Sequence, residues 1–310
     1  MKCINIVVFL IALILAPFSS PSHSSPFPSK QLLSQYKRAM ERAIQIVLTN
    51  VKPNLNEIEK HLLSKIDITV DINNWNLYGV YAYKRQGQIG INFPISFVIA
   101  VGEIDEAVVA AQFLQIPFEK VMDYISYYTD QTKKNIRLRN RNKPMLETKS
   151  FYYFTGVSEA KYKELINSEE FVYAFEELRL HSTALIVNHE LAHHFNAHLE
   201  NNVSILTEEI EADRKAIELS LAANYNPLLR IPTPLFFASL EDDTGIYDGT
   251  STHPPSICRA ILAVDIGRLE LMKDLKFIAF LKKTKQYNNW NKNLSLLKQT
   301  IMQDVECPNL

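Results

Sequence analysis

Apolar residues recur at intervals of three and four along several stretches of the chain, and polar residues fill the positions between them. This spacing is typical of helices that bury one face. Pro53 and Pro227 separate neighbouring stretches, because proline disfavours helix at the residue before it. Beyond Ala107 we expect the chain to be mostly helical. The predicted helices begin near Leu33, Leu55, Phe171, Thr207 and Ile257.

The period changes to two after the second of these helices. Apolar and polar residues alternate from Ile66 to Ile72, which predicts a strand. Tyr78–Lys84 and Gln88–Asn92 are predicted to form a β-hairpin that turns through Arg85-Gln86-Gly87. The sequence therefore predicts an α+β fold that is predominantly helical, with a small β-sheet N-terminal to the helix that begins at Phe171.

The first 24 residues are typical of a secretory signal peptide. Lys2 precedes an apolar run from Ile4 to Phe18, and Ser- and Pro-rich residues follow as far as Ser29. We expect cleavage near residue 24, which leaves residues 25–310 as a single domain that is exported to the periplasm or secreted. The alternative is an uncleaved membrane tether, but an apolar run of about 15 residues is shorter than the roughly 20 that a span needs. We expect no membrane span in the rest of the chain.

Two cysteines, Cys258 and Cys307, remain after that cleavage. They could pair in an oxidising compartment or stay as two independent thiols. Neither belongs to a CxxC pair, so a cysteine-based zinc site is not indicated.

The formal net charge of −1 gives the chain no global field that favours nucleic acid, and we expect no nucleic-acid partner. Lys and Arg residues gather between Lys133 and Lys143, where they could contact an acidic partner. Such runs are more often solvated, and we interpret this one as a solvated loop.

Candidate chemistry is concentrated in the segment His189-Glu190-Leu191-Ala192-His193. On a helix, His189 and His193 project from one face and can bind one metal ion. Glu190 is rotated about 100° from His189 and lies beside that ion, where a general base can take a proton from metal-bound water. The alternative is a polar, His-rich helix that binds no metal.

A catalytic zinc usually takes three protein ligands and keeps a fourth position for water. The extended pattern HExxHxxGxxH is excluded, because Asn196 and Leu199 occupy its glycine and third-histidine positions. His194 and His198 do not fit that spacing, and we interpret both as surface or packing histidines. The third ligand is therefore expected from another part of the chain.

Two acidic residues of the helix that begins near Thr207 fall on or beside its apolar stripe. At 100° per residue, Glu209 and Asp213 lie one turn apart on this side. Glu211 lies opposite with Lys215, and we expect these two to form an i,i+4 ion pair. Buried carboxylates are costly unless they are compensated. A zinc ion bound by Glu209, with Asp213 holding a ligand histidine, would compensate them, and the alternative is a buried salt bridge to an arginine. The apolar stripe consists of Leu206, Ile210, Ile217 and Leu221.

Three motifs together resemble a known group. The HExxH segment and Glu209-Ile210-Glu211-Ala212-Asp213 resemble the HExxH and ExxAD motifs of gluzincin peptidases related to HtpX and the CAAX prenyl proteases. Ser251-Thr252-His253-Pro254-Pro255, with Arg259 four residues later, is similar to the His-Pro plus Arg motif of that group. The phage-exclusion peptidase Lit has similar versions of all three. The resemblance covers roughly residues 180 to 262.

The resemblance implies a zincin-like fold with one Zn²⁺ ion. The implied zinc ligands are His189, His193 and Glu209. Glu190 is implied as the general base. His253 and Arg259 join it as candidate catalytic residues in a supporting role, and Asp213 would lie behind a ligand histidine.

These motifs predict a zinc-dependent metallopeptidase that acts as an endopeptidase on a protein or peptide substrate. An extended substrate could lie along Gln88–Asn92 if this strand forms an edge of the sheet. Tyr247 is a weaker candidate for stabilising the oxyanion. The alternative function is a catalytically silent binding protein that retains zinc for stability, and an intact Glu190 favours catalysis over this alternative. A third possibility is an accidental HExxH.

Overall fold

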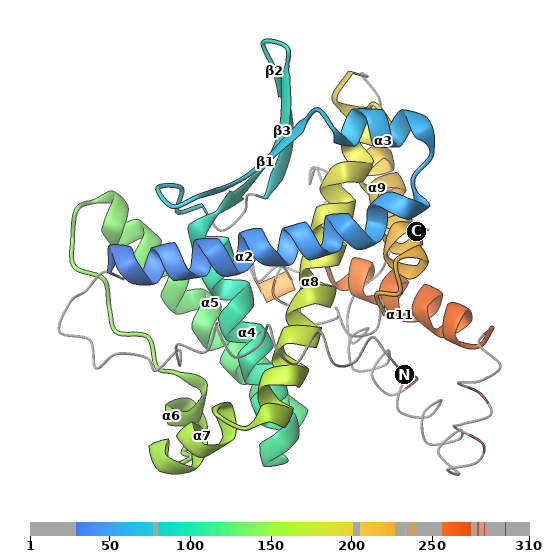
Figure 1. The fold of residues 1–310 in the computed structure, drawn as a ribbon. Helices are drawn as coiled ribbons and strands as arrows, with labels where there is room; N and C mark the ends of the chain where they lie inside the picture. The colour runs from blue at the N-terminus through green and yellow to red at the C-terminus, as the bar shows by residue number, and fades with distance from the viewer. Residues whose placement is uncertain are drawn as a thin grey trace.

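The computed structural model describes residues 29–76, 80–200, 205–226 and 256–273, together with a few single positions beyond them. Over these ranges the chain is predominantly helical with a small three-stranded sheet, as the sequence predicts (Figure 1). The predictions for the signal peptide, Tyr247, His253 and Cys307 lie outside the described residues.

The elements follow the predicted order. The chain before and within the sheet forms α2 (Lys30–Val51), η1 (Lys52–Asn54), α3 (Glu57–Leu63), β1 (Ile66–Asp71), β2 (Tyr81–Arg85) and β3 (Gln88–Pro94). The chain after the sheet forms α4 (Ile95–Leu114), α5 (Phe118–Asn140), α6 (Phe151–Thr155), α7 (Glu159–Ile166), α8 (Glu169–Phe195), η2 (His198–Glu200), α9 (Ile205–Ala222) and α11 (Ser256–Leu271). The five helices predicted from apolar spacing are confirmed as α2, α3, α8, α9 and α11.

The sheet has the strand order β1-β3-β2. β3 pairs with β1 in parallel and with β2 as the predicted antiparallel hairpin. Gln86 and Gly87 turn the hairpin with φ angles of 50° and 82°, as a two-residue type I′ turn requires. Because β3 is paired on both sides, the prediction that Gln88–Asn92 forms an edge is wrong, and the edge strands are β1 and β2.

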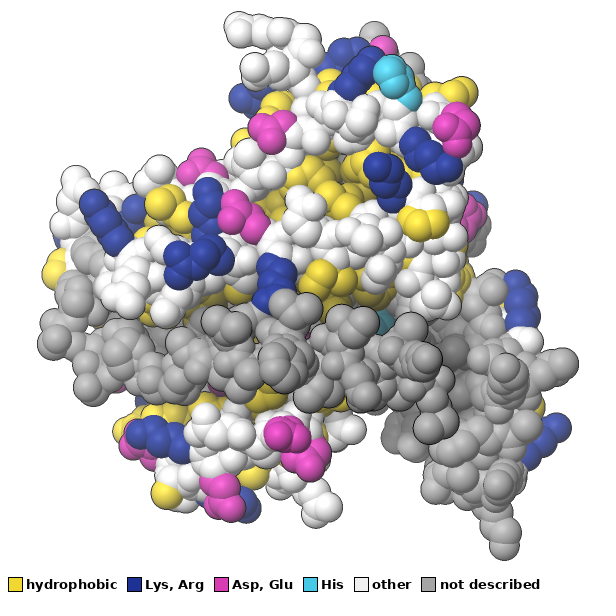
Figure 2. Space-filling model, viewed as in Figure 1, with side chains coloured by type: hydrophobic (Ala, Val, Ile, Leu, Met, Phe, Trp, Pro, Cys, Tyr) yellow, Lys and Arg dark blue, Asp and Glu magenta, His cyan; other side chains and the backbone are white. Residues whose placement is uncertain are grey.

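The basic run between Lys133 and Lys143 is mostly helical, so its interpretation as a loop is wrong. α5 continues to Asn140, and the guanidinium of Arg139 lies 4.5 Å from the ring centroid of Trp75. Lys and Arg are good helix formers, and their long stems can cover apolar neighbours while the charges stay in water. Basic and acidic side chains are interspersed on the face of the molecule that Figure 2 shows.

α8 is the central helix of the fold, and it packs against α2, α4 and α9 (Figure 1). Its first turn is capped by the hydroxyl of Ser168, which accepts a hydrogen bond from the backbone of Phe171. The Tyr124 ring of α5 lies edge-on to Phe151 in the core. Among the described residues, no helix has both the length and the apolar character that crossing a bilayer requires.

Cys258 of α11 is buried and disulfide-bonded, so it is not a free thiol. Its partner lies outside the described residues.

Asp105 is buried in α4 with a relative exposure of 1%. The Ser182 hydroxyl of α8 donates a hydrogen bond to its Oδ1 atom across 3.0 Å. Burial raises the pKa of Asp105 to about 7, and this hydrogen bond and the charge of Arg179 offset only part of that rise. The folded state therefore holds a proton that the unfolded chain releases near pH 3.8.

We expect the free energy of unfolding to fall as the pH rises from about 4 to about 7. Between about pH 4 and pH 7 only the unfolded state loses the proton, at a cost of about 1.4 kcal/mol per pH unit. The side chain in Asp105→Asn cannot ionise. The free energy of unfolding of this variant minus that of the wild type should therefore rise by roughly 4 kcal/mol from pH 4 to pH 7 and then level off. Urea denaturation at several pH values measures this difference.

Asp123→Asn is the matched control, since the Asp123 side chain is 56% exposed on α5 and its ion pair with Lys120 lies on the surface. Its stability should follow that of the wild type at every pH. An Asp105→Asn curve parallel to the wild-type curve would contradict the prediction.

Candidate metal centre

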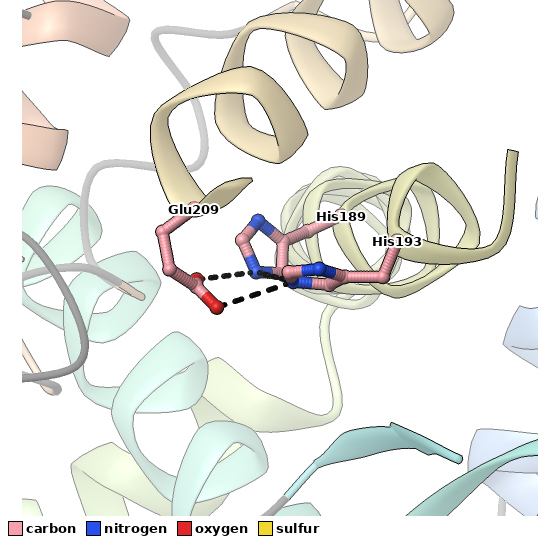
Figure 3. A group of neighbouring side chains, drawn as sticks. All are labelled: His189, His193 and Glu209. Atoms are coloured by element: carbon pink, nitrogen blue, oxygen red, sulfur yellow. Dashed lines mark hydrogen bonds and ion pairs between the residues drawn. The ribbon is translucent and has the colours of Figure 1, made fainter. Parts of the chain in front are cut away.

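His189 and His193 lie one turn apart near the C-terminal end of α8, and their rings converge (Figure 3). Both side chains are buried, and their Nε2 atoms are 3.1 Å apart. The helix continues to Phe195, so both imidazoles project from a rigid element. The predicted common face of the two histidines is confirmed.

Glu209 brings a carboxylate to these histidines from the facing helix α9 (Figure 3). Its Oε2 atom lies 3.2 Å from Nε2 of His189, and its Oε1 atom lies 3.3 Å from Nε2 of His193. α9 can approach α8 closely because small residues occupy its buried face. These small residues are Ala212, Ala216 and Ser220. The prediction that Glu209 and Asp213 face the core is confirmed, since each is only 5% exposed.

The spacing of the three donor atoms fits a zinc ion. A tetrahedral zinc holds its donors at about 2.0–2.1 Å, which puts those donors roughly 3.3 Å from one another. Here the two imidazole nitrogens are 3.1 Å apart, and each of them lies 3.2 or 3.3 Å from a different oxygen of the Glu209 carboxylate. Two imidazoles and one carboxylate are also ligands that catalytic zinc takes. Among the described residues, His189, His193 and Glu209 form the group whose donors are close enough to share an ion.

Asp213 holds His189 on the side away from this candidate ion. Its Oδ1 atom lies 2.9 Å from Nδ1 of His189, and Arg259 of α11 donates hydrogen bonds to both carboxylate oxygens, each across 2.7 Å. Two parallel, charge-assisted bonds of this kind fix both partners. Burial alone would raise the pKa of Asp213, but Arg259 and His189 hold it well below its ordinary value.

The same contacts change the acidity of His189. Burial and the charge of Arg259 lower its pKa, but hydrogen bonds to Asp213 and Glu209 outweigh them and raise the pKa of His189 to about 10. Because Arg259 binds Asp213, and Asp213 binds Nδ1 of His189, Arg259 can position the His189 ring through Asp213.

Glu190 lies beside the histidines with a relative exposure of 7%, and burial is the main reason why its pKa rises to about 7. The backbone N–H of Ala82 donates a hydrogen bond to Glu190 Oε2 across 2.6 Å. Because Ala82 belongs to the edge strand β2, this bond brings an edge of the sheet to the site. Sequence reasoning did not find this neighbour of Glu190.

His194 is a buried packing histidine, as predicted. Its Nε2 atom lies 3.0 Å from the carbonyl oxygen of Gly90, so it joins α8 to the central strand β3. Gly90 has no room for a side chain, since a Cβ atom would lie 2.5 Å from the backbone oxygen of Asp67 and against the Tyr83 ring.

His198 is also buried, but it contacts a candidate ligand. Its Nδ1 atom lies 3.1 Å from Nδ1 of His193, and its Nε2 atom lies 3.2 Å from Oε2 of Glu211. The predicted ion pair between Glu211 and Lys215 is therefore wrong. Lys215 instead binds Glu59 of α3 across 2.9 Å, because tertiary packing brings α3 within its reach.

Comparisons of the chain with protein-family models, with curated proteins and with solved structures find no match. The resemblance to gluzincin peptidases stays a prediction from the motifs.

Proposed function

We propose that the chain is a zinc-dependent metallopeptidase with a zincin-like arrangement of its active-site helix and sheet. The observation that carries this proposal is the convergence of two imidazole nitrogens and the Glu209 carboxylate, at separations close to those around a tetrahedral zinc, beside the buried Glu190. A structural zinc site closes all four positions with protein ligands, whereas three donors meet here within the described residues. A glutamate in the position of a general base, Glu190, beside these donors favours catalysis over a zinc-stabilised binding protein.

A zinc ion held by His189, His193 and Glu209 would polarise a substrate carbonyl and lower the pKa of a bound water. Glu190 follows His189 and is turned about 100° from it around α8, so its carboxylate can take a proton from that water. It can then pass the proton to the amine that leaves when the peptide bond breaks. Arg259 would act through Asp213, by holding His189 in the orientation that the ion needs.

We propose β2, rather than β3, as the strand that receives an extended peptide. Ala82 directs its N–H away from β3 and toward Glu190. The carbonyl of a strand residue points to the same side as its N–H, so the Ala82 carbonyl also lies on the outer edge, beside the N–H that Glu190 accepts from. A peptide that pairs with this edge would run within reach of Glu190.

Metal analysis combined with digestion of a peptide library tests the proposal. The purified protein should carry one zinc ion per chain, cleave internal peptide bonds, lose cleavage in a chelator and regain it with zinc. His189→Ala should lose the zinc, whereas His61→Ala, an exposed position on α3, should keep it. One zinc per chain without any cleavage would favour the binding protein. A metal-free protein whose melting temperature does not respond to zinc would overturn the site.

A further inference from the structure

The two candidate ligand histidines are held in different ways on the side away from the ion. His189 reaches a carboxylate of α9 directly, through Asp213. His193 reaches one through an intermediate, because its Nδ1 atom faces Nδ1 of His198 and the far nitrogen of His198 faces Glu211. Both paths thus end on carboxylates of α9, two residues apart along that helix.

The backbone after α8 turns sharply, and the turn brings His198 back to His193. The helix ends at Phe195, and Ala197 has a φ of +56°, in the left-handed region that helix ends usually assign to glycine. An alanine in this conformation costs about 1–2 kcal/mol. The side chain of the next residue, His198, is only 3% exposed, so its two ring nitrogens need partners inside the protein. His193 and Glu211 are those partners.

The direction of the hydrogen bonds follows from Glu211. An ionised carboxylate only accepts hydrogen bonds, so a neutral His198 that donates to Glu211 does so from Nε2 and has its lone pair on Nδ1. That lone pair accepts from Nδ1–H of His193. The Nε2 atom of His193 is then left with a lone pair directed at the site, which is the tautomer that a metal ligand must have.

We propose that His198 is a positioning residue that, with Glu211, fixes the ring orientation and tautomer of His193 for zinc binding. This inference rests on the proposed zinc site. It adds two functional residues that do not donate an atom to the candidate ion: His198 lies outside the three motifs, and Glu211 occupies an unspecified position of ExxAD.

The test compares zinc affinities, measured by competition with a chromophoric chelator, and the visible spectrum of the Co²⁺-substituted protein. His198→Ala should bind zinc about 10–100-fold more weakly than the wild type, the usual effect of removing the partner behind a ligand histidine. Its Co²⁺ spectrum should shift, because the His193 ring is free to rotate. His198→Gln can accept from His193 and donate to Glu211 through its amide, so it should recover most of the affinity.

His181→Ala is the matched control for the loss of a buried histidine. His181 lies on α8, is 7% exposed and bonds to the backbone of Glu177, without contact to the donor atoms. Its zinc affinity and Co²⁺ spectrum should match those of the wild type, even if its melting temperature falls as far as that of His198→Ala.

Each outcome separates this inference from the proposed function. Wild-type zinc affinity and an unchanged Co²⁺ spectrum in His198→Ala would overturn the positioning role and leave the enzyme proposal intact. A His198→Gln variant as weak as His198→Ala would also overturn it, because packing would then explain the loss. A wild-type protein that binds no zinc would overturn both. If His198→Ala does not fold, His198→Gln and Glu211→Ala decide the question, since the Glu211 side chain is 57% exposed and its loss should spare the fold.

Discussion

Replacing Glu190 with glutamine is expected to abolish peptide cleavage and to leave zinc in place. Glutamine keeps the size of the side chain and can still accept the hydrogen bond from Ala82, but it cannot take a proton from water. A positioned general base contributes about 10²–10⁴-fold to the rate, so kcat should fall at least about 10²-fold. Peptide digestion and metal analysis of the same preparation measure the two quantities.

Glu170→Gln provides the control, because Glu170 is an exposed glutamate in the first turn of the same helix. It should retain wild-type cleavage and zinc content. A Glu190→Gln variant that still cleaves peptides would remove Glu190 from the role of base. A variant that loses zinc together with cleavage would make Glu190 part of the metal site instead.

Replacing Arg259 with methionine is expected to lower the free energy of unfolding of the zinc-free protein by about 3–5 kcal/mol. Asp213 is buried, and its two shortest hydrogen bonds, each 2.7 Å, come from this guanidinium. Methionine fills similar space and carries no charge, so it would leave a buried carboxylate without its main partner. Urea denaturation in the presence of a chelator measures the change.

Arg268→Met tests whether any arginine of α11 has this effect. Arg268 is exposed on the same helix, and its loss should change stability by no more than about 0.5 kcal/mol. Adding Asp213→Asn to Arg259→Met should restore part of the stability, since no charge is then stranded. A loss below about 1 kcal/mol in Arg259→Met alone would contradict a buried, hydrogen-bonded ion pair.

The burial of Glu209 and Asp213 could be predicted from the sequence, because the angle between helix positions is fixed by backbone geometry. The prediction of where the buried face of α9 is centred was less accurate. Leu206 and Leu221 are partly exposed, whereas Ala212 and Ala216 are fully buried. Large apolar residues dominate the hydrophobic pattern of a sequence, but small residues lie where two helices approach most closely.

The link between His193, His198 and Glu211 could not be predicted from spacing. It depends on the left-handed conformation of Ala197, and alanine gives no signal for that conformation as glycine would. The partner of Lys215 was missed for a related reason. Glu59 lies far away in the sequence, and only the packing of α3 beside α9 brings it near.

Local periodicity identified the strands but not their order. The hairpin of β2 and β3 follows from a two-residue turn, whereas the parallel pairing of β1 with β3 is set by the fold as a whole. The position of the sheet edge, and hence the strand next to Glu190, depends on that second pairing.

α8 buries every residue from Ile186 to His194, so this stretch has no solvent-facing side. Packing residues and candidate reactive residues are interspersed within this stretch of the helix. A substitution that alters the chemistry here also alters the core, and mutational scanning should find few tolerated changes at any of these positions. Divergence in substrate preference would then accumulate outside this helix, on surfaces such as the edge of β2, where side chains can change without repacking the interior.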